Sequence, residues 1–462
     1  MVRRPMGKLV CALLLGAVVA AGCGSSDRGG DDSGSGTTTT AAASTAATTF
    51  GDLPSPCGKG DAKGATEQGV TDTAITIGYG DDAGFAASPG LDHEVTDAMK
   101  AMVTWCNDQG GILGRQIDGR YYDAKVTEVN NVMTEACATV FMLVGEGWSL
   151  DGGGEQKRVE CGLPAVPAFA VSPEFAHGPG MVQAVPNPID YVSTQNAAAI
   201  AEAFPAKITK TAVMFGNYPS TIVTKDKVLA SYPKFGFEFL PCPQAYNIAG
   251  EADYKPFAQK LKSCGAEIVY FTGAPAPYFE NFLEAANQLD YHPLYMTDAN
   301  FYDASFAKWN KDGFADDVYV RETFPALDQA EKVPAIKDFL AIVEAAGGDA
   351  SQLGEEAASS FLLWATAAKA CGSTLTRACM ANELAKVHSW TGGGLHAETD
   401  PAANKPPACG LTLKLEGTKF VQFAPKEAGT LDCSPEFLQH VTGPMVDAAK
   451  LGPDRVSTLY SK

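Results

Sequence analysis

Cysteine is the residue type with the most evident chemistry in this chain of 462 residues, which contains twelve of them. Two, Cys11 and Cys23, lie at the N-terminal end, and the other ten are spread over the rest of the sequence. No CxxC pair occurs, and the six histidines show no HExxH or similar ligand spacing. We therefore expect neither a metal site nor a cofactor.

Cys23 ends a segment that is typical of an exported lipoprotein. Three basic side chains come first, and residues 9–21 form an apolar run that is too short to span the roughly 30 Å of bilayer hydrocarbon. The sequence Ala-Ala-Gly-Cys23 resembles a bacterial lipobox, in which the cysteine is acylated and becomes the mature N-terminus. The alternative is an ordinary cleaved signal with an incidental cysteine. We predict a signal peptide over residues 1–22, lipidation at Cys23 and a location at the outer face of the cytoplasmic membrane.

Residues 23–57 are predicted to be a disordered tether. They are rich in Ser, Thr and Gly, and they contain almost no large apolar side chain. Such a segment buries too little surface to offset the entropy lost on ordering. A flexible chain of this length reaches about 30 Å, which keeps a domain near a membrane partner without fixing its orientation.

The exported chain is strongly acidic. Without the three basic residues of the leader, 32 basic residues face 54 acidic ones, a net charge of −22. This balance excludes a nucleic-acid partner and a polybasic grip on the membrane. The charge favours solubility, and we expect a monomer.

The ten remaining cysteines indicate disulfides, because an even number in an exported chain is typical of a disulfide framework. Pairing neighbours in order closes short loops, although the sequence leaves the connectivity open. That rule pairs Cys57 with Cys106, Cys137 with Cys161, Cys242 with Cys264, Cys371 with Cys379, and Cys409 with Cys433.

From Thr73 onward, short β-branched runs alternate with helical stretches. This alternation favours parallel sheets with right-handed crossovers. The first half predicts strands at 75–78, 116–122, 142–144 and 165–169, and helices at 91–109, 126–141 and 154–161.

The same rhythm restarts after Pro188 and then gives way to helices. We predict helices at 191–204, 220–232, 254–262 and 278–289, and strands at 211–215, 235–241, 267–271 and 293–297. A helical block at 333–346, 355–370 and 377–387 precedes a hairpin of 411–415 and 419–423 around Glu416-Gly417. Two α/β halves with later helices indicate a bilobal protein with repeated chain crossings.

Several segments of the chain form a recognisable set. They are Ile75-Thr-Ile-Gly, Asn107-Asp-Gln-Gly-Gly-Ile-Leu-Gly-Arg-Gln-Ile117, Tyr121-Tyr-Asp123, Gly162-Leu-Pro-Ala-Val-Pro167, Glu267-Ile-Val-Tyr-Phe-Thr-Gly273 and Gly392-Gly-Gly-Leu. Together they resemble type I periplasmic binding proteins of the branched-chain amino acid receptor group. In the second segment, two glycines end the helix tightly and the following Ile anchors the turn. The similarity extends, in order, over roughly Thr73 to Pro425.

The resemblance implies two Rossmann-like α/β lobes with parallel sheets flanked by helices, joined by a multi-crossing hinge. It implies lobes of 73–188 plus about 322–408 and of 189–321 plus about 409–462. It also implies a solute-binding lipoprotein, not an enzyme, that captures an amino acid, an amide or a larger apolar or aromatic compound and delivers it to ABC permease subunits.

The ligand is expected where loops leave the carboxyl ends of the strands. Aromatic residues gather in these loops and indicate a cleft that stacks flat or apolar groups, although each one could instead pack under its own loop. The predicted ligand-binding residues are Phe85, Trp148, Ser149, Phe169, Ala170, Ser172, Tyr218, Ala274, Tyr278, Asp298, Asn300 and Phe301.

In the amino-acid receptors of the family, hydroxyls hold the ligand carboxylate and an acidic residue of the second lobe holds its ammonium. By position, Ser149 and Ser172 match the hydroxyls and Asp298 lies nearest the acidic residue. Trp148 and Phe169 stand where the family has small, hydroxyl-rich loops. We therefore expect a bulkier or less polar ligand than an α-amino acid.

Two rival functions are an enzyme and a sensor. The sequence contains no G-x-S-x-G and no P-loop, and we interpret acidic pairs such as Asp81-Asp82 and Glu355-Glu356 as solvated faces or caps. A sensor of the same fold would present its closed form to a membrane receptor or kinase, and nothing in the chain distinguishes this docking partner from a permease.

Overall fold

The computed structural model describes residues 49–460. The predicted signal peptide, Cys23 and most of the predicted tether lie outside these residues. The last part of the tether differs from the prediction, because β1 (Thr49–Phe50) and β2 (Leu53–Pro54) form an antiparallel hairpin. Phe50 is fully buried in the core, and it supplies the apolar surface that the rest of the tether lacks.

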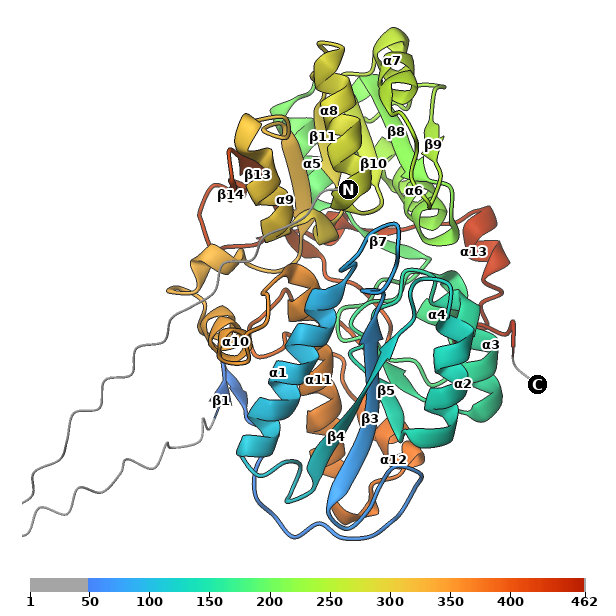
Figure 1. Cartoon of the computed structure of the whole chain (residues 1–462), viewed down its shortest axis with the longest axis vertical. Helices are drawn as coiled ribbons and strands as arrows, with labels where there is room; N and C mark the ends of the chain where they lie inside the picture. Colours follow the sequence, from blue (N-terminus) through green and yellow to red (C-terminus); the bar gives the residue numbers. More distant parts are fainter. Residues whose placement is uncertain (1–48, 461–462) are drawn as a thin grey trace, which may run out of the picture. The chain divides into compact units, whose positions relative to one another are not determined.

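The N-terminal lobe is built on a four-stranded parallel sheet (Figure 1). Its strands, in spatial order, are β4 (Gln116–Asp123), β3 (Ala74–Asp81), β5 (Met142–Val144) and β6 (Ala165–Val166). Side chains alternate between its faces: Met142 and Val144 face one core cluster and Leu143 the other. The first cluster packs under α1 (His93–Asp108), α10 (Pro334–Ala345) and α11 (Gln352–Cys371), and the second under α2 (Val129–Thr139) and α3 (Gly152–Cys161).

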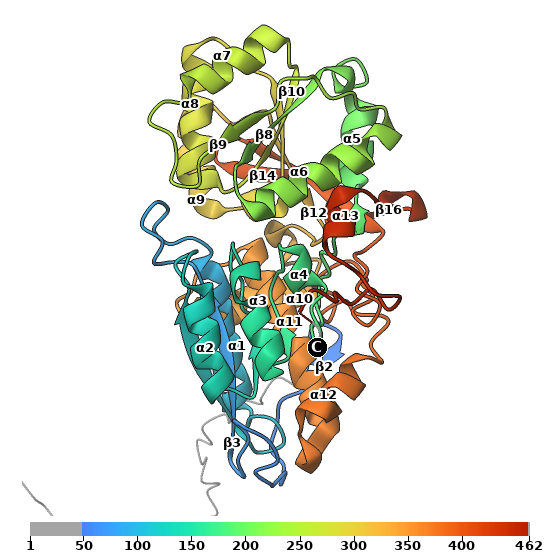
Figure 2. The same ribbon diagram turned by 90° about the vertical axis from the view of Figure 1, so that its right-hand side faces the viewer.

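The C-terminal lobe repeats this plan with a larger sheet (Figure 2). Its strands, in spatial order, are β14 (Lys419–Ala424), β13 (Cys409–Glu416), β12 (Val318–Glu322), β11 (Leu294–Thr297), β10 (Ile268–Thr272), β8 (Thr211–Gly216) and β9 (Gln244–Tyr246). The five strands from β12 to β9 are parallel, and the predicted hairpin of β13 and β14 adds an antiparallel edge. One face packs on α5 (Gln195–Ala203) and α6 (Pro219–Ser231), and the other on α7 (Lys255–Cys264), α8 (Glu280–Gln288) and α9 (Ala304–Trp309).

The remaining elements complete the two lobes and the segments that cross between them. They are β7 (Tyr191–Ser193), which pairs with β16 (Leu438–His440), β15 (Asp432–Cys433), α4 (Pro173–Ala176), α12 (Arg377–Leu384) and α13 (Pro444–Ala448). The chain leaves the N-terminal lobe after α4, returns to it after β12 and leaves again after α12. Among the described residues, no helix is both long and apolar enough to cross a bilayer.

The end of the chain corrects one expected lobe boundary. We expected residues 409–462 to belong to the C-terminal lobe, but α13 contacts α4 of the N-terminal lobe. The Ser457 N–H donates to the His177 carbonyl at 2.7 Å, and the Arg455 guanidinium forms an ion pair with Asp190. The C-terminal segment thus crosses the hinge a further time.

Two predicted elements have different bounds because of proline and local pairing. The predicted strand 235–241 is reduced to a single parallel bridge between Phe239 and Thr211: Tyr232–Phe235 is a 3-10 helix, and the edge strand is β9. Pro241 lacks the N–H that a ladder requires. The predicted helix 191–204 instead begins with β7, whose three residues pair with β16 before α5 starts.

All five disulfides expected from the neighbour rule are present, which confirms that connectivity. The described bridges are Cys57–Cys106, Cys137–Cys161, Cys242–Cys264, Cys371–Cys379 and Cys409–Cys433. Each joins segments that are already neighbours in the fold, such as α2 with α3 and α11 with α12.

The turn after α1 shows why its sequence pattern matters for the fold. Gly110 and Gly111 have φ of 113° and 72°, values that an L-residue with a side chain rarely adopts. The Asn107 side chain accepts the Ile117 N–H at 2.7 Å and donates to the Ile117 carbonyl at 2.9 Å. These bonds join the helix end to the start of β4 and so fix the crossover.

Candidate functional site

The two lobes face each other across a cleft at the carboxyl ends of both parallel sheets. Its first part, here called the aromatic chamber, has an empty volume of about 950 Å³, including space open to solvent. Loops after β3 and β5 form one wall, and loops after β8, β10 and β11 form the other. Doubly wound sheets bind ligands at this position, because the strand order reverses there and loops diverge.

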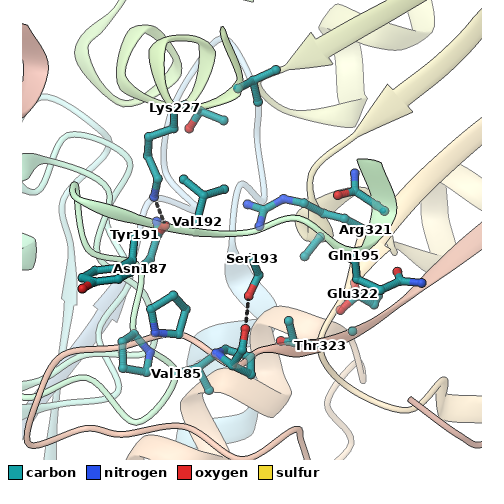
Figure 3. A pocket seen from close by; sticks show the side chains of 18 of the residues that line it. Val185, Asn187, Tyr191, Val192, Ser193, Gln195, Lys227, Arg321, Glu322 and Thr323 are labelled. Atoms are coloured by element: carbon teal, nitrogen blue, oxygen red, sulfur yellow. Dashed lines mark hydrogen bonds between the residues drawn. The ribbon is translucent and has the colours of Figure 1, made fainter. Parts of the chain in front are cut away.

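A second chamber adjoins the first beside the segments that cross between the lobes. This hinge chamber has a similar empty volume of about 950 Å³. Its polar lining includes Asn187, Lys227, Arg321 and Glu322, which Figure 3 shows, and also Glu356. The two chambers share the residues Phe169, Asn187, Thr224, Ala299, Arg321 and Glu356. They therefore form one continuous cleft.

The structure brings eight of the predicted ligand-binding residues together around the aromatic chamber. The N-terminal lobe contributes Phe85, Ser149 and Phe169, and the C-terminal lobe contributes Tyr218, Ala274, Tyr278, Asp298 and Asn300. A groove lined from both lobes by aromatic rings suits a flat or apolar group.

The chamber wall at the end of β10 requires a glycine. Gly273 has φ of 152°, and a Cβ there would lie 1.7 Å from the Tyr246 hydroxyl and 3.4 Å from that of Tyr218. The missing side chain lets the two tyrosines approach the strand end. The Asn300 side chain donates to the Gly273 carbonyl at 2.8 Å and so fixes this backbone at the cleft.

Trp148 and Ala170 do not line the cleft, which corrects their predicted role. Trp148 is 1% exposed and packs in the core of the N-terminal lobe, together with Leu143 and Phe175. Ala170 is fully buried in the same cluster. Trp148 fills the apolar space between the sheet and the helices α2 and α3, and its side chain therefore lies away from the cleft.

Phe301 and Ser172 are also committed to the fold instead of the chambers. Phe301 is fully buried, and its ring contacts Phe279 edge to face at a centroid distance of 5.3 Å. The Ser172 hydroxyl accepts the Phe175 N–H at 3.3 Å and thereby caps α4. Its own N–H donates to Asp151 at 3.0 Å. Neither residue lines the hinge chamber or the aromatic chamber.

Asp298 lines the cleft, but its carboxylate is already paired. Its Oδ1 accepts the Arg321 Nε–H at 3.0 Å and the Tyr270 hydroxyl at 2.7 Å. Arg321 lies on β12, beside the end of β11, so the two side chains meet across neighbouring strands. The predicted ammonium-binding role of Asp298 is thus replaced by an internal ion pair that places a guanidinium in the cleft.

Among the acidic pairs that we interpreted as solvated faces or caps, Asp81, Asp82 and Glu355 are buried, which corrects that interpretation for them, whereas Asp316 and Asp317 are exposed as expected. Asp82 and Glu355 are 0% exposed and Asp81 is 1% exposed. Burial raises the pKa of Asp82 to about 6, although its Oδ2 accepts the Ser149 N–H at 2.7 Å. The Ser149 hydroxyl donates to Asp92 at 3.2 Å. The hydroxyl expected to hold a ligand therefore holds an acidic loop in place.

Sequence reasoning missed the charged lining of the hinge chamber. Lys227 lies within α6, Arg321 within β12 and Glu356 within α11. We searched the loops after strands, and these residues belong to regular elements that turn toward the hinge. For Lys227, a signal was available in the sequence. This lysine lies next to Val228, at a position of α6 that faces the protein interior.

One group of described residues has the side chains of a metal site. His93, Asp97 and Asp349 bring one ligand atom each to within 4.8 Å of one another. Asp349 is exposed, and the histidine ring also lies 3.4 Å from Glu94. None of the three lines either chamber, and an ion network among them accounts for the arrangement.

Comparison with known proteins identifies the family. A family model of periplasmic binding proteins matches residues 74–419. The chain belongs to the periplasmic binding protein family. It has the type I fold of that family, and the family consists of solute-binding proteins. A search of curated protein sequences gave no match.

Solved structures with the same fold are distant in sequence. A fatty acid ABC transporter substrate-binding protein from Thermomonospora curvata is 14% identical with a TM-score of 0.65, covering 80% of this chain and 95% of that one. The leucine binding protein LivK from Thermotoga maritima is 14% identical with a TM-score of 0.63, covering 76% and 98%. A solute binding protein from Rhodopseudomonas palustris in complex with p-hydroxybenzoic acid is 14% identical with a TM-score of 0.64, covering 79% and 98%.

Proposed function

We propose that this protein is an extracytoplasmic solute-binding lipoprotein of an ABC importer. It captures one small molecule in the interlobe cleft, closes around it and delivers it to a membrane permease. The observation that carries this proposal is the continuous cleft that both lobes line at their strand ends. The family of the chain supports the same role.

Closure follows from contacts that a ligand makes with both lobes. A ligand that touches both walls stabilises the closed form, and it shifts the open–closed equilibrium by its differential affinity. Moving this equilibrium from 1:99 to 99:1 requires about 5.5 kcal/mol of difference. Phe85 on one wall and Tyr278 on the other are placed to supply part of this difference.

The ligand that suits the aromatic chamber has an apolar or aromatic part larger than an amino-acid side chain. Phe85, Phe169, Tyr218 and Tyr278 provide ring surface from both lobes. Structures of the same fold carry names that mention leucine, fatty acid and p-hydroxybenzoic acid. The last two support a less polar solute for this chain.

Anchoring at Cys23 would place the protein on the outer face of the cytoplasmic membrane, beside its permease. Expression in cells supplied with radiolabelled palmitate tests acylation at Cys23. Cys23→Ala is the variant, and Cys11→Ala is the matched control. We expect label in the wild type and in Cys11→Ala, and none in Cys23→Ala. Equal labelling of all three would overturn the lipid anchor.

Small-angle scattering tests the binding function on the exported chain. Native mass spectrometry of the purified protein first identifies co-purifying solutes, and a thermal-shift screen of aromatic acids, fatty acids, amides and amino acids extends the search. We expect one molecule per chain and a smaller radius of gyration at saturation. An unchanged radius of gyration on saturation would contradict hinge closure, and turnover of a bound compound would indicate an enzyme.

A further inference from the structure

We propose that the hinge chamber is an anion subsite in which Lys227 and Arg321 hold a carboxylate group of the ligand. The ligand is then an organic acid whose apolar or aromatic body lies in the aromatic chamber. This inference rests on the proposed solute-binding function and adds the charge of the solute. Both cations belong to the C-terminal lobe, in which family resemblance predicted an acidic residue for a ligand ammonium.

Lys227 is a buried ammonium without a carboxylate partner. The residue is 8% exposed, and its Nζ donates to the Asn187 side-chain oxygen at 2.6 Å (Figure 3). Within residues 49–460 it has no ion pair with a carboxylate. An ammonium has three donors, so two of them are open to a ligand. Leaving a charge buried and unpaired is costly, and a bound anion would remove that cost.

Arg321 adds a second cation whose orientation is fixed. Its Nε–H is bonded to Asp298, which also accepts the Tyr270 hydroxyl, while the guanidinium lines both chambers. In the described structure its two terminal nitrogens make no hydrogen bond. A guanidinium held at Nε presents its remaining N–H groups as a planar fork that matches a carboxylate.

One nearby carboxylate offsets one of the two charges, because Asp298 is paired with Arg321. Asp190 is paired with Arg455, so it leaves Lys227 without a carboxylate partner. Burial raises the pKa of Glu356 to about 8 and raises that of Glu322 as well. The Glu356 carboxyl is therefore largely protonated at neutral pH. Glu322 lines the same chamber, and both of its carboxyl oxygens are buried.

The continuity of the chambers determines the shape of the acid. Phe169 and Asn187 line both chambers, and the rings of Tyr218 and Tyr278 lie in the aromatic chamber only. A carboxylate beside Lys227 thus leaves its apolar body directed toward those rings. A zwitterionic amino acid fits poorly, because its ammonium would lie among two cations.

Matched acid and amide probes test this assignment. The probes are 4-phenylbutyrate with 4-phenylbutyramide and decanoate with decanamide, measured by calorimetry on the wild type and on Lys227→Met. We expect the wild type to bind each acid at least about tenfold more tightly than its amide, and Lys227→Met to lose most of that preference. Lys225→Met, two residues away on α6 and outside both chambers, is expected to keep it.

Proton uptake provides a readout that a merely structural role of Lys227 would not change. Burial and the neighbouring Arg321 lower the pKa of Lys227 to about 7, while Asp298 and Asp190 raise it. The other titratable groups around it are His177, Glu322, Glu356 and the hydroxyls of Tyr191, Tyr232 and Tyr270. A bound anion raises this pKa again, so the wild type should take up about half a proton per acid at pH 7. Calorimetry in buffers of different ionisation enthalpy measures the uptake, which Lys227→Met should abolish.

The outcomes separate this inference from the proposed function. If the acids and amides bind equally and close the cleft, solute binding stands and the anion subsite is overturned. If Lys227→Met keeps both the preference and the proton uptake, the subsite is likewise overturned. If no probe or natural solute binds or changes the radius of gyration, the proposed function itself fails.

Discussion

At the scale of single residues, burial determines the role of a side chain more than its chemical type. Trp148 and Phe85 are both aromatic residues of loops at the cleft, yet Trp148 is 1% exposed in a core cluster and Phe85 lines the chamber. In the same way, Asp298 is a carboxylate that lines the cleft, but it is already paired with the guanidinium of Arg321. The first prediction for single residues therefore compares the effect of a substitution on stability with its effect on ligand affinity.

Replacing Trp148 with Ala is expected to lower the free energy of unfolding by about 3–5 kcal/mol, because it empties a large core site. The affinity of the folded protein for its solute should change little. Phe85→Ala is the matched comparison, with weaker binding and an almost unchanged melting temperature. Denaturant titration and calorimetry measure both quantities, and a large loss of affinity with intact stability in Trp148→Ala would contradict the structure.

Glu146 gives a second residue-scale prediction, on pH. It is fully buried with both oxygens unpartnered, and burial raises its pKa to about 8. The folded protein thus holds a proton on Glu146 that the unfolded chain releases. The contribution of this proton to the free energy of unfolding is therefore lost as the pH rises from the pKa of Glu146 in the unfolded chain toward 8. The slope is up to about 1.4 kcal/mol per pH unit.

Glu146→Gln removes this titration, since an amide stays neutral. The stability gained by Glu146→Gln over the wild type should be larger at pH 8 than at pH 5, as measured by denaturant unfolding at each pH. A difference that is constant between these pH values would show that the carboxyl does not titrate in this range.

At the scale of elements, three of the disulfides and the Asn107 turn join neighbouring segments of the N-terminal lobe. The Cys57–Cys106 bridge fixes the segment before β3 to the last turn of α1. The Cys371–Cys379 bridge joins α11 to α12 over a much shorter loop, with a sequence separation of 8 against 49. Closing a longer loop removes more entropy from the unfolded chain.

Removing these two bridges should therefore have unequal effects. The double variant Cys57→Ala with Cys106→Ala is expected to lose about 4 kcal/mol of unfolding free energy, and Cys371→Ala with Cys379→Ala about 2.5 kcal/mol. Chemical denaturation of both double variants beside the wild type gives the comparison. A larger loss for the shorter loop would mean that native packing, not chain entropy, determines the contribution of these bridges.

At the scale of the whole molecule, direct contacts join the two lobes across the cleft. Leu91 of the N-terminal lobe packs against the core cluster of the C-terminal lobe. The Ser88 hydroxyl donates across the cleft to the Ala276 carbonyl at 3.0 Å. In the proposed hinge closure, such contacts favour the closed form before any ligand binds.

Leu91→Ala is accordingly expected to weaken solute affinity by about fivefold, because it removes apolar contact from the closed form. Its radius of gyration without solute should equal or exceed that of the wild type. Leu340→Ala is the matched control, since Leu340 packs only within the N-terminal lobe; it should lower stability and leave affinity unchanged. Equal affinity losses in the two variants would contradict a specific role of Leu91 in closure.

Much of this architecture could be read from local patterns. The alternation of strands and helices, the glycines after α1 and the spacing of the cysteines all act over short stretches, so they predicted the sheets, the crossover and the five bridges. Two of the errors were local as well. Burial of Phe50 orders the end of the predicted tether, and Pro241 limits the predicted strand 235–241 to a single bridge at Phe239.

The binding cleft depended instead on the packing of distant segments. Lys227 and Arg321 are far apart in the chain, and they enter one chamber because α6 and β12 both turn toward the crossing segments. Whether Trp148 or Phe169 faces the ligand space depends on which core each loop covers. Local sequence encodes the period and the ends of an element, but the direction of a loop side chain is decided by the neighbours that compete to bury it.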